Sequence, residues 1–480
     1  MLKKYYSFLL TIISGILLST SICISSLSLL QFIAFIPFLF AIHQKNLKET
    51  ALYSFITGYI SLSAILFSIA AFNFAIYILF TLLLSLTVIY IGTLYRYLNI
   101  KFTNWFIIYT LPIFWVILEI FATEGFLSLP LNLGLGQYRN IILIQIADIF
   151  GIYGISFLVM LINISLFYLL IQIKENKQKI NWLPLLPPLI IISCTFIYGG
   201  MELNQAEKKD NIKSFALIQG NLNFEELVLR YKSRKFHKIS EDRYFRMIQE
   251  AAKQNPDYII VPESGLMGYF LNIPNLNRKY KQLAIDVGTN LIFQGKEKSE
   301  GKLYSTMFMV SNNGSVIGIS RKYKPIHLAE IDFSHNKSFA PIKTNNIYIG
   351  VQICFDICFP SISRKLVQNK ATVLVVSSND GRFGYSPFSI LHHSFLAFRA
   401  IENRRSILSA NNSGISSSIN SKGEIKQESQ INTETILYAK VSTQSGQTLF
   451  NKSGFINIFI FLGTYLLIGI IGVLGDKQIS

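Results

Sequence analysis

Three residues of different chemistry stand directly after, or between, segments rich in β-branched and aromatic side chains. Glu263 and Cys354 each follow an apolar run, and Lys322 lies in a basic stretch between them. Because the residues of an α/β site gather at strand ends, we expect these three side chains to lie together.

A glutamate, a lysine and a cysteine together supply what acyl transfer through a thioester requires. The cysteine must become a thiolate to attack, and a carboxylate whose pKa is raised by burial can accept its proton. A fixed ammonium can stabilise the oxyanion of the tetrahedral intermediate. Each residue alone has a structural explanation, as a turn carboxylate, a small core thiol or a solvated cation. Their combination favours a nucleophilic enzyme.

The cysteines form neither a zinc-ligand spacing nor a disulfide framework. Cys23 and Cys194 lie inside apolar runs, and Cys358, shortly after Cys354, is expected to be a buried and inert thiol. We therefore predict no metal site and no organic cofactor.

The composition places much of the chain in a membrane. Of 480 residues, 51% are hydrophobic and only 15% are charged, whereas a soluble domain carries about a quarter charged residues. A spanning helix needs about 20 apolar residues. Such runs predict a polytopic α-helical membrane bundle of about eight spans, at 7–24, 27–42, 51–70, 73–95, 103–122, 147–172, 182–200 and 454–474. Two acids within or beside these spans, Glu119 and Asp148, are costly there and are given no role.

The distribution of basic residues predicts the orientation of the spans. Lys and Arg cluster in alternate short connections, at 3–4, 45–48, 96–101 and 174–179. Because basic connections stay in the cytoplasm, we expect residues 201–452 to lie outside it, between a bundle at 1–200 and a last span within 453–480. The net charge of +17 is explained by a bilayer surface more simply than by nucleic acid, which we do not expect as a partner.

Residues 201–452 indicate a separate α/β domain, because short β-branched runs alternate with amphipathic stretches. Strands are predicted at 215–219, 258–262, 291–294, 304–310, 347–353, 373–377, 407–410 and 436–441. Helices are predicted at 238–253, 275–287, 361–368 and 388–404. The Ser/Asn-rich segment 411–421 is expected to form turns.

At the reactive residues the chain resembles a known superfamily. The motifs are similar to the Glu-Lys-Cys triad of the nitrilase, or carbon-nitrogen hydrolase, superfamily: Val261-Pro262-Glu263, Arg321-Lys322 and Ile353-Cys354-Phe355-Asp356. Other runs resemble its membrane branch, the apolipoprotein N-acyltransferases: Ser378-Asn379-Asp380 followed by His392, Arg399-Ala400-Ile401-Glu402, and Gln145 to Phe157. The resemblance implies a nitrilase-like α-β-β-α sandwich for the extramembrane domain.

The resemblance also implies roles for the site residues. Glu263 would be the general base, Cys354 the nucleophile and Lys322 the lysine that stabilises the oxyanion. Lys322 is preferred to Lys324 because it precedes Glu330 by eight residues, which is the family spacing.

The resemblance implies three further residues that support the site. Two of the three differ from the residue that the family has at that position. Glu330 matches the family, whereas Phe355 and Asp356 stand where the family has a tyrosine and a glutamate. The extramembrane domain has no tryptophan, and Val261 replaces one. We expect these differences to change the preference for acyl chain or acceptor.

The implied reaction transfers an acyl chain from a membrane phospholipid, through a cysteine thioester, to the α-amino group of the N-terminal diacylglyceryl-cysteine of apolipoproteins. The implied location is the bacterial inner membrane, with the catalytic domain on the periplasmic side. The alternative is a membrane-anchored nitrilase-type amidohydrolase that uses water as acceptor. A third possibility is a channel or transporter with a binding domain, but its spans should be lined by polar residues and these spans are poor in them.

Overall fold

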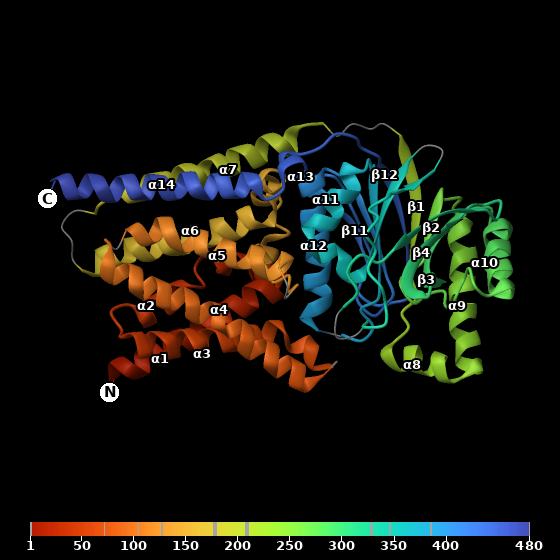
Figure 1. The fold of residues 1–480 in the computed structure, drawn as a ribbon, viewed down its shortest axis with the longest axis horizontal. Coiled ribbons are helices and arrows are strands. Elements are labelled where there is room, and N and C mark those ends of the chain that lie inside the picture. The colour runs from red at the N-terminus through yellow and green to blue at the C-terminus, as the bar shows by residue number, and fades with distance from the viewer. Residues whose placement is uncertain are drawn as a thin grey trace. The chain divides into compact units, whose positions relative to one another are not determined.

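The computed structural model describes the chain apart from residues 1, 72, 104, 126–127, 176–179, 207–210, 327–329, 345–346, 385 and 480. It divides into two compact units, Met1–Asn204 with Ser453–Ser480, and Gln205–Lys452. Figure 1 shows both units. Two of the basic residues used to predict the orientation, Lys177 and Lys179, lie outside the described residues.

The first unit is a bundle of apolar helices. Its elements are α1 (Leu2–Cys23), η1 (Ser25–Phe32), α2 (Ile36–Ile42), α3 (Leu47–Ile65), η2 (Phe67–Ala71), α4 (Phe74–Lys101), α5 (Phe106–Glu124), η3 (Leu133–Gln137), η4 (Leu143–Ile146), α6 (Ala147–Lys174), η5 (Leu183–Leu185), α7 (Leu186–Asn204) and α14 (Ile456–Ile479). Among the described residues, seven segments are long and apolar enough to cross a membrane: Tyr5–Cys23, Ser25–Ile42, Phe74–Lys101, Phe106–Glu124, Leu143–Lys174, Leu183–Asn204 and Ile456–Gly475. The chain is a multi-pass membrane protein, which confirms the predicted class.

The predicted span at 51–70 corresponds to α3, which is not one of the seven segments found in the described part of the chain. Its first turn contains Lys48 and Glu49, and Ser, Thr and Tyr recur along its length. These residues lower its hydropathy. The helix nevertheless packs against both α1 and α4. Eight predicted spans therefore become seven apolar helices and one more polar helix of the same bundle.

The two acidic residues of the bundle have hydrogen-bond partners there. Glu119 on α5 accepts hydrogen bonds from the backbone N–H of Leu133 and the indole N–H of Trp115, each at 2.7 Å. It thereby caps the start of η3. Asp148 on α6 accepts a hydrogen bond from the hydroxyl of Tyr198 at 2.8 Å. Because burying a carboxylate is costly unless it is hydrogen-bonded, these contacts give both acids a structural role.

The second unit contains two six-stranded sheets. The first sheet has the order β12 (Thr435–Ser442), β1 (Ile212–Gln219), β2 (Tyr258–Ile260), β3 (Asn290–Ser299), β4 (Lys302–Val310), β5 (Val316–Arg321). The second has the order β11 (Ile425–Glu428), β10 (Ser417–Ile419), β9 (Ile407–Asn411), β8 (Val373–Ser378), β7 (Tyr348–Ile353), β6 (Ile342–Lys343). Strands β1 to β3 and strands β7 to β9 are parallel, and the remaining pairs are antiparallel.

The two sheets pack face to face, and helices cover their outer faces (Figure 1). Side chains alternate between the two faces of a strand. Phe215 and Leu217 therefore point into the core between the sheets, while Ala216 and Ile218 meet the helices. The first sheet is covered by α9 (Arg234–Ala252) and α10 (Pro274–Asp286), and the second by α11 (Pro360–Gln368) and α12 (Pro387–Asn403). This arrangement confirms the predicted α-β-β-α sandwich.

The strands that sequence reasoning missed are short, exposed or polar. All eight predicted strands and all four predicted helices are present, but β5, β6, β10, β11 and α8 (Phe224–Lys232) were not predicted. The segment 411–421 was expected to form turns, which is wrong for its second half. Ser417–Ile419 form the buried strand β10 between β9 and β11.

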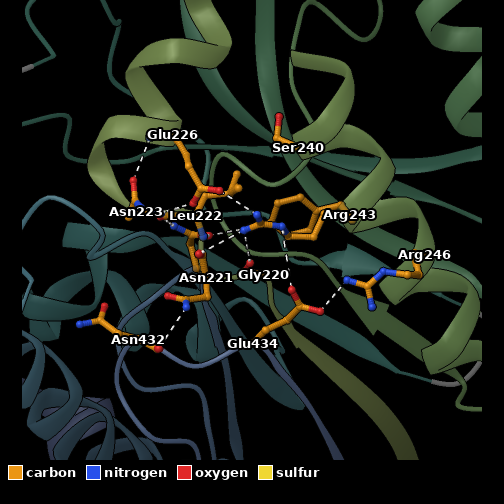
Figure 2. Close-up of polar contacts among 12 residues, drawn as sticks. Gly220, Asn221, Leu222, Asn223, Glu226, Ser240, Arg243, Arg246, Asn432 and Glu434 are labelled. Atoms are coloured by element: carbon orange, nitrogen blue, oxygen red, sulfur yellow. Dashed lines mark hydrogen bonds and ion pairs between the residues drawn. The ribbon is translucent and has the colours of Figure 1, made fainter. Parts of the chain in front are cut away.

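The loop that follows β1 is held by charged and amide groups (Figure 2). Arg243 on α9 donates hydrogen bonds to the carbonyls of Gly220 and Asn221, at 3.2 and 3.3 Å. The same guanidinium pairs with Glu226 at 2.7 Å. Asn223 and Glu226 form a capping box at the start of α8. This network fixes α8 against α9.

Candidate active site

The structure places the three predicted reactive residues at the ends of strands. Glu263 lies shortly after β2, Lys322 follows β5, and Cys354 follows β7 as the first residue of η6 (Cys354–Cys358). Lys322 and Cys354 are buried, whereas 13% of the Glu263 side chain is exposed. One partly accessible carboxylate thus lies beside two buried groups.

The ammonium of Lys322 lies among carboxylates. Its Nζ is 2.8 Å from Oε2 and 2.9 Å from Oε1 of Glu330, and 3.6 Å from Oε1 of Glu263. Glu263 also interacts with the thiol of Cys354, which favours the charged form of the carboxylate. The fold therefore brings together four of the residues singled out in the sequence, although they come from segments far apart in the chain.

Burial dominates the acid–base properties of these groups. It raises the pKa of Glu263, and the opposing charge of Lys322 does not cancel the effect. Burial, together with the charge of Glu263, raises the pKa of the Cys354 thiol well above its usual value. Burial alone would lower the pKa of Lys322, but the charges of Glu263, Cys354 and Glu330 outweigh it and the pKa is raised. The resting site therefore holds a protonated thiol, a permanent ammonium and a carboxylate able to accept a proton.

Asp356 connects the segment of Lys322 to the segment of Cys354. Its carboxylate accepts hydrogen bonds from the backbone N–H groups of Lys324 at 2.8 Å and Ile353 at 3.0 Å. Lys324 lies two residues after Lys322, and Ile353 directly precedes Cys354. A single side chain thus links the two backbone segments that carry these residues. Burial raises the pKa of Asp356 to about 6.

The side chains of Phe355 and Lys324 both lie against the aromatic ring of Phe359. The rings of Phe355 and Phe359 meet edge to face, with centroids 5.0 Å apart. The Nζ of Lys324 lies 3.8 Å from the centroid of the same Phe359 ring. Of the two candidate lysines, Lys322 is thus the one directed at the reactive carboxylate.

Two residues of the site have a left-handed backbone, with φ of 47° at Cys354 and 64° at Ser264. Such conformations are costly for residues other than glycine, so the surroundings must hold them. Buried Arg230 on α8 donates hydrogen bonds to the carbonyls of Ser264 and, at 3.1 Å, Gly265. Arg230 therefore supports the turn that carries Glu263. Sequence reasoning missed Arg230, because a basic residue on an amphipathic stretch carries no signal of burial.

Helix α12 places a histidine beside the backbone of Cys354. Nε2 of His392 is 3.2 Å from the carbonyl oxygen of Cys354, and its Nδ1 is 3.1 Å from Oδ1 of Asp380. Cys358 is also buried nearby in η6, and burial raises the pKa of its thiol. Over the described part of the chain, no three His, Cys, Asp or Glu side chains are grouped as metal ligands would be.

Comparisons with known proteins agree with this architecture. Residues 242–449 match the carbon-nitrogen hydrolase family, and residues 14–165 match the apolipoprotein N-acyltransferase N-terminal domain. Among solved structures, a carbon-nitrogen hydrolase from Helicobacter pylori G27 is 18% identical with a TM-score of 0.41, covering 49% of this chain and 90% of that one. The two family matches together indicate a membrane protein with a domain of the carbon-nitrogen hydrolase class.

Relatives along the whole chain narrow this class to one family. The apolipoprotein N-acyltransferase of Geobacter metallireducens is 30% identical, covering 93% of this chain and 91% of that protein. The apolipoprotein N-acyltransferase of Borreliella burgdorferi is 28% identical, covering 70% of each chain. The chain belongs to the apolipoprotein N-acyltransferase family and is an acyltransferase, which confirms the predicted enzyme class.

Proposed function

We propose that the protein moves an acyl chain from a membrane phospholipid to the α-amino group of the N-terminal diacylglyceryl-cysteine of apolipoproteins. One observation carries the proposal. The buried ammonium of Lys322 lies 3.6 Å from Glu263, whose charged form is also favoured by its interaction with the Cys354 thiol. The names of the relatives support the choice of acceptor.

In the first half-reaction, Glu263 takes the proton of the Cys354 thiol. The thiolate attacks the ester carbonyl of the phospholipid, and the ammonium of Lys322 stabilises the resulting oxyanion. When the tetrahedral intermediate collapses, the bond to the glycerol oxygen breaks and Glu263 returns its proton to that oxygen. The products are a lysophospholipid and an acyl thioester on Cys354.

In the second half-reaction, the neutral α-amino group of the acceptor attacks the thioester. Glu263, again a carboxylate, accepts the proton that the amine loses, and Lys322 again stabilises the oxyanion. The carbon–sulfur bond breaks, an amide forms, and the thiolate of Cys354 recovers its proton from Glu263. The raised pKa of Glu263 serves both directions of proton transfer.

We also infer that the catalytic domain, residues 201–452, faces the outside of the cytoplasm, with the bundle at 1–200 and the last helix at 453–480 anchoring it. The inference needs α3 to cross the membrane as the more polar eighth span, and the basic connections support it. Both substrates carry acyl chains, and moving a chain into water costs about 0.8 kcal/mol per methylene. A site at the membrane surface avoids that cost.

The test uses the purified full-length protein in phospholipid nanodiscs with a synthetic diacylated lipopeptide. We expect mass spectrometry to show that the peptide gains one acyl chain for each lysophospholipid formed. A lipopeptide with an acetylated α-amino group is the matched control and should gain none. Release of free fatty acid with no acylated peptide would contradict transfer and favour the water-using amidohydrolase.

A further inference from the structure

His392 lies between two oxygen atoms that can only accept hydrogen bonds. Its Nδ1 is 3.1 Å from the carboxylate of Asp380, and its Nε2 is 3.2 Å from the carbonyl oxygen of Cys354. A neutral imidazole has one N–H and can serve only one of these acceptors. Both hydrogen bonds form when the ring is an imidazolium, with a hydrogen on each nitrogen.

The carboxylate that faces this ring is itself held in one orientation. Oδ2 of Asp380 accepts a hydrogen bond from Nδ2 of Asn411 at 2.8 Å, and the backbone N–H of Asp380 donates to Oδ1 of Asn411 at 3.1 Å. Gly414 packs so closely that a Cβ atom there would collide with both side chains. Asp380 is therefore a fixed anchor for the imidazole.

The carbonyl at the other side of the ring belongs to a strained residue. Cys354 has a φ of 47°, which a residue with a Cβ adopts only when its surroundings compensate. Rotation of this backbone to an ordinary extended conformation would turn the carbonyl away from His392. The hydrogen bond from the imidazole thus favours the left-handed conformation that Cys354 adopts in this structure.

The charges around the thiol make a second cation useful. The carboxylates of Glu263, Asp380 and Glu330 all disfavour a thiolate at Cys354, and only Lys322 opposes them among the leading influences in the described site. An imidazolium in contact with the backbone of Cys354 adds a second positive charge near the thiol.

The groups that face His392 favour its charged form. They are Asp380 after β8, Cys354 on η6 and Glu263 after β2. On its own helix, the charged Arg399 is paired with Glu402 at 2.9 Å. Burial alone would lower the pKa of His392, but the carboxylate of Asp380 outweighs it and the pKa is raised.

We propose that His392, as an imidazolium held between Asp380 and the carbonyl of Cys354, is a positioning residue that keeps the nucleophile in its left-handed conformation and stabilises its thiolate. The inference rests on the proposed function because it takes Cys354 as the nucleophile. His392 then has two separate effects on Cys354. Its hydrogen bond sets the backbone conformation, and its charge sets the fraction of the thiol present as thiolate.

The experiment measures alkylation of Cys354 by iodoacetamide in the full-length protein across a range of pH, with the modified peptide identified by mass spectrometry. His392→Gln keeps an N–H donor but loses the charge, whereas His392→Ala loses both. His393→Gln changes the adjacent, equally buried histidine and is the matched control. Alkylation needs neither phospholipid nor lipopeptide, so its outcome is independent of whether acyl transfer occurs.

We expect His392→Gln to raise the apparent pKa of Cys354 by about one unit, a tenfold lower thiolate fraction, while the plateau rate at high pH is retained. His392→Ala should show the same shift and a plateau at least about tenfold lower. His393→Gln should match the unchanged protein. Unaltered alkylation profiles in both folded His392 variants, even with a lowered melting temperature, would overturn the proposal and leave His392 a purely structural residue.

Discussion

The ammonium of Lys322 and the carboxylate of Glu330, eight residues apart in the chain, lie 2.8 Å apart in the structure. The same carboxylate accepts a hydrogen bond from the backbone N–H of Ile326 at 2.8 Å. The hydrogen bond to Ile326 holds the Glu330 carboxylate in place, and this carboxylate in turn orients the Lys322 side chain. In this orientation the Lys322 ammonium also lies 3.6 Å from Glu263. The eight-residue spacing between Lys322 and Glu330 is therefore part of the site geometry.

This relationship predicts different effects for the two neighbouring lysines. Lys322→Ala removes the charge aimed at the developing oxyanion, so the rate of acyl-enzyme formation should fall roughly 10²–10³-fold. Lys322→Arg should be nearly as inactive, because a guanidinium cannot place its charge at the same point. Lys324→Ala is the control and should change the rate little. Quenched-flow mass spectrometry of the thioester measures the rate of each variant. An inactive Lys324→Ala together with an active Lys322→Ala would contradict the choice of Lys322.

A second prediction concerns Arg230, which holds the turn after Glu263. Arg230→Ala leaves the carbonyls of Ser264 and Gly265 without their donor, and should cost about 1–3 kcal/mol of stability. Acyl-enzyme formation should also slow by at least about tenfold, because Glu263, the proposed general base, is no longer held in place. Arg246→Ala, which removes an exposed ion pair with Glu434 (Figure 2), is the control and should do neither. Thermal unfolding and single-turnover rates decide, and an unchanged rate in Arg230→Ala would show that Glu263 does not depend on it.

The central strands of both sheets were predictable because they are parallel strands covered on both faces, and such strands read as continuous apolar runs. The edge strands gave a weaker signal. In β5 only one of the six residues is buried, and β6 has only two residues. Strand β10 lies inside the second sheet but begins with two serines, whose polarity indicates a turn until their neighbours are known.

The residues of the site likewise include some that the sequence predicts and some that it does not. Glu263 and Cys354 could be chosen from the sequence because each follows a predictable strand. Lys322 could be chosen because it precedes Glu330 by eight residues, although the strand before it, β5, was not predicted. Arg230 could not, because its burial depends on two backbone carbonyls of a distant turn. The contact between His392 and Cys354 likewise exists only once α12 packs beside η6, and no local pattern specifies it.

A third prediction follows from Asp356, whose pKa is raised by burial from an ordinary value of 3.8 to about 6. The folded protein therefore binds the Asp356 proton more tightly than the unfolded chain does. The stability contributed by the protonated carboxyl is present below about pH 4 and is lost as the pH rises to about 6. Relative to Asp356→Asn, which does not titrate, the unchanged protein should lose on the order of 3 kcal/mol across this window. Thermal unfolding of both proteins at several pH values measures the difference, which should be constant above pH 7. A difference that is constant from pH 4 to 7 would contradict the prediction.

A fourth prediction tests the orientation in the membrane. With Cys23 and Cys194 replaced by serine, Lys302→Cys in the catalytic domain should react with an impermeant thiol reagent in intact cells. Lys174→Cys at the end of α6 should react only after the membrane is permeabilised. The positive charges retained in the cytoplasm are the physical reason. The opposite labelling pattern would place the catalytic domain in the cytoplasm and remove the proposed acceptor, which matures outside it.

The last prediction distinguishes the two cysteines of η6. Cys354 interacts with Glu263, the proposed base that takes its proton, so Cys354→Ala should abolish acyl-enzyme formation entirely. Cys358 is 3% exposed and burial raises the pKa of its thiol, so Cys358→Ala should retain the thioester and lose only about 1 kcal/mol of packing energy. Incubation with phospholipid, followed by peptide mapping of a hydroxylamine-sensitive acyl adduct, measures both variants. An adduct on Cys358, or one that persists in Cys354→Ala, would place the nucleophile elsewhere and contradict the mechanism.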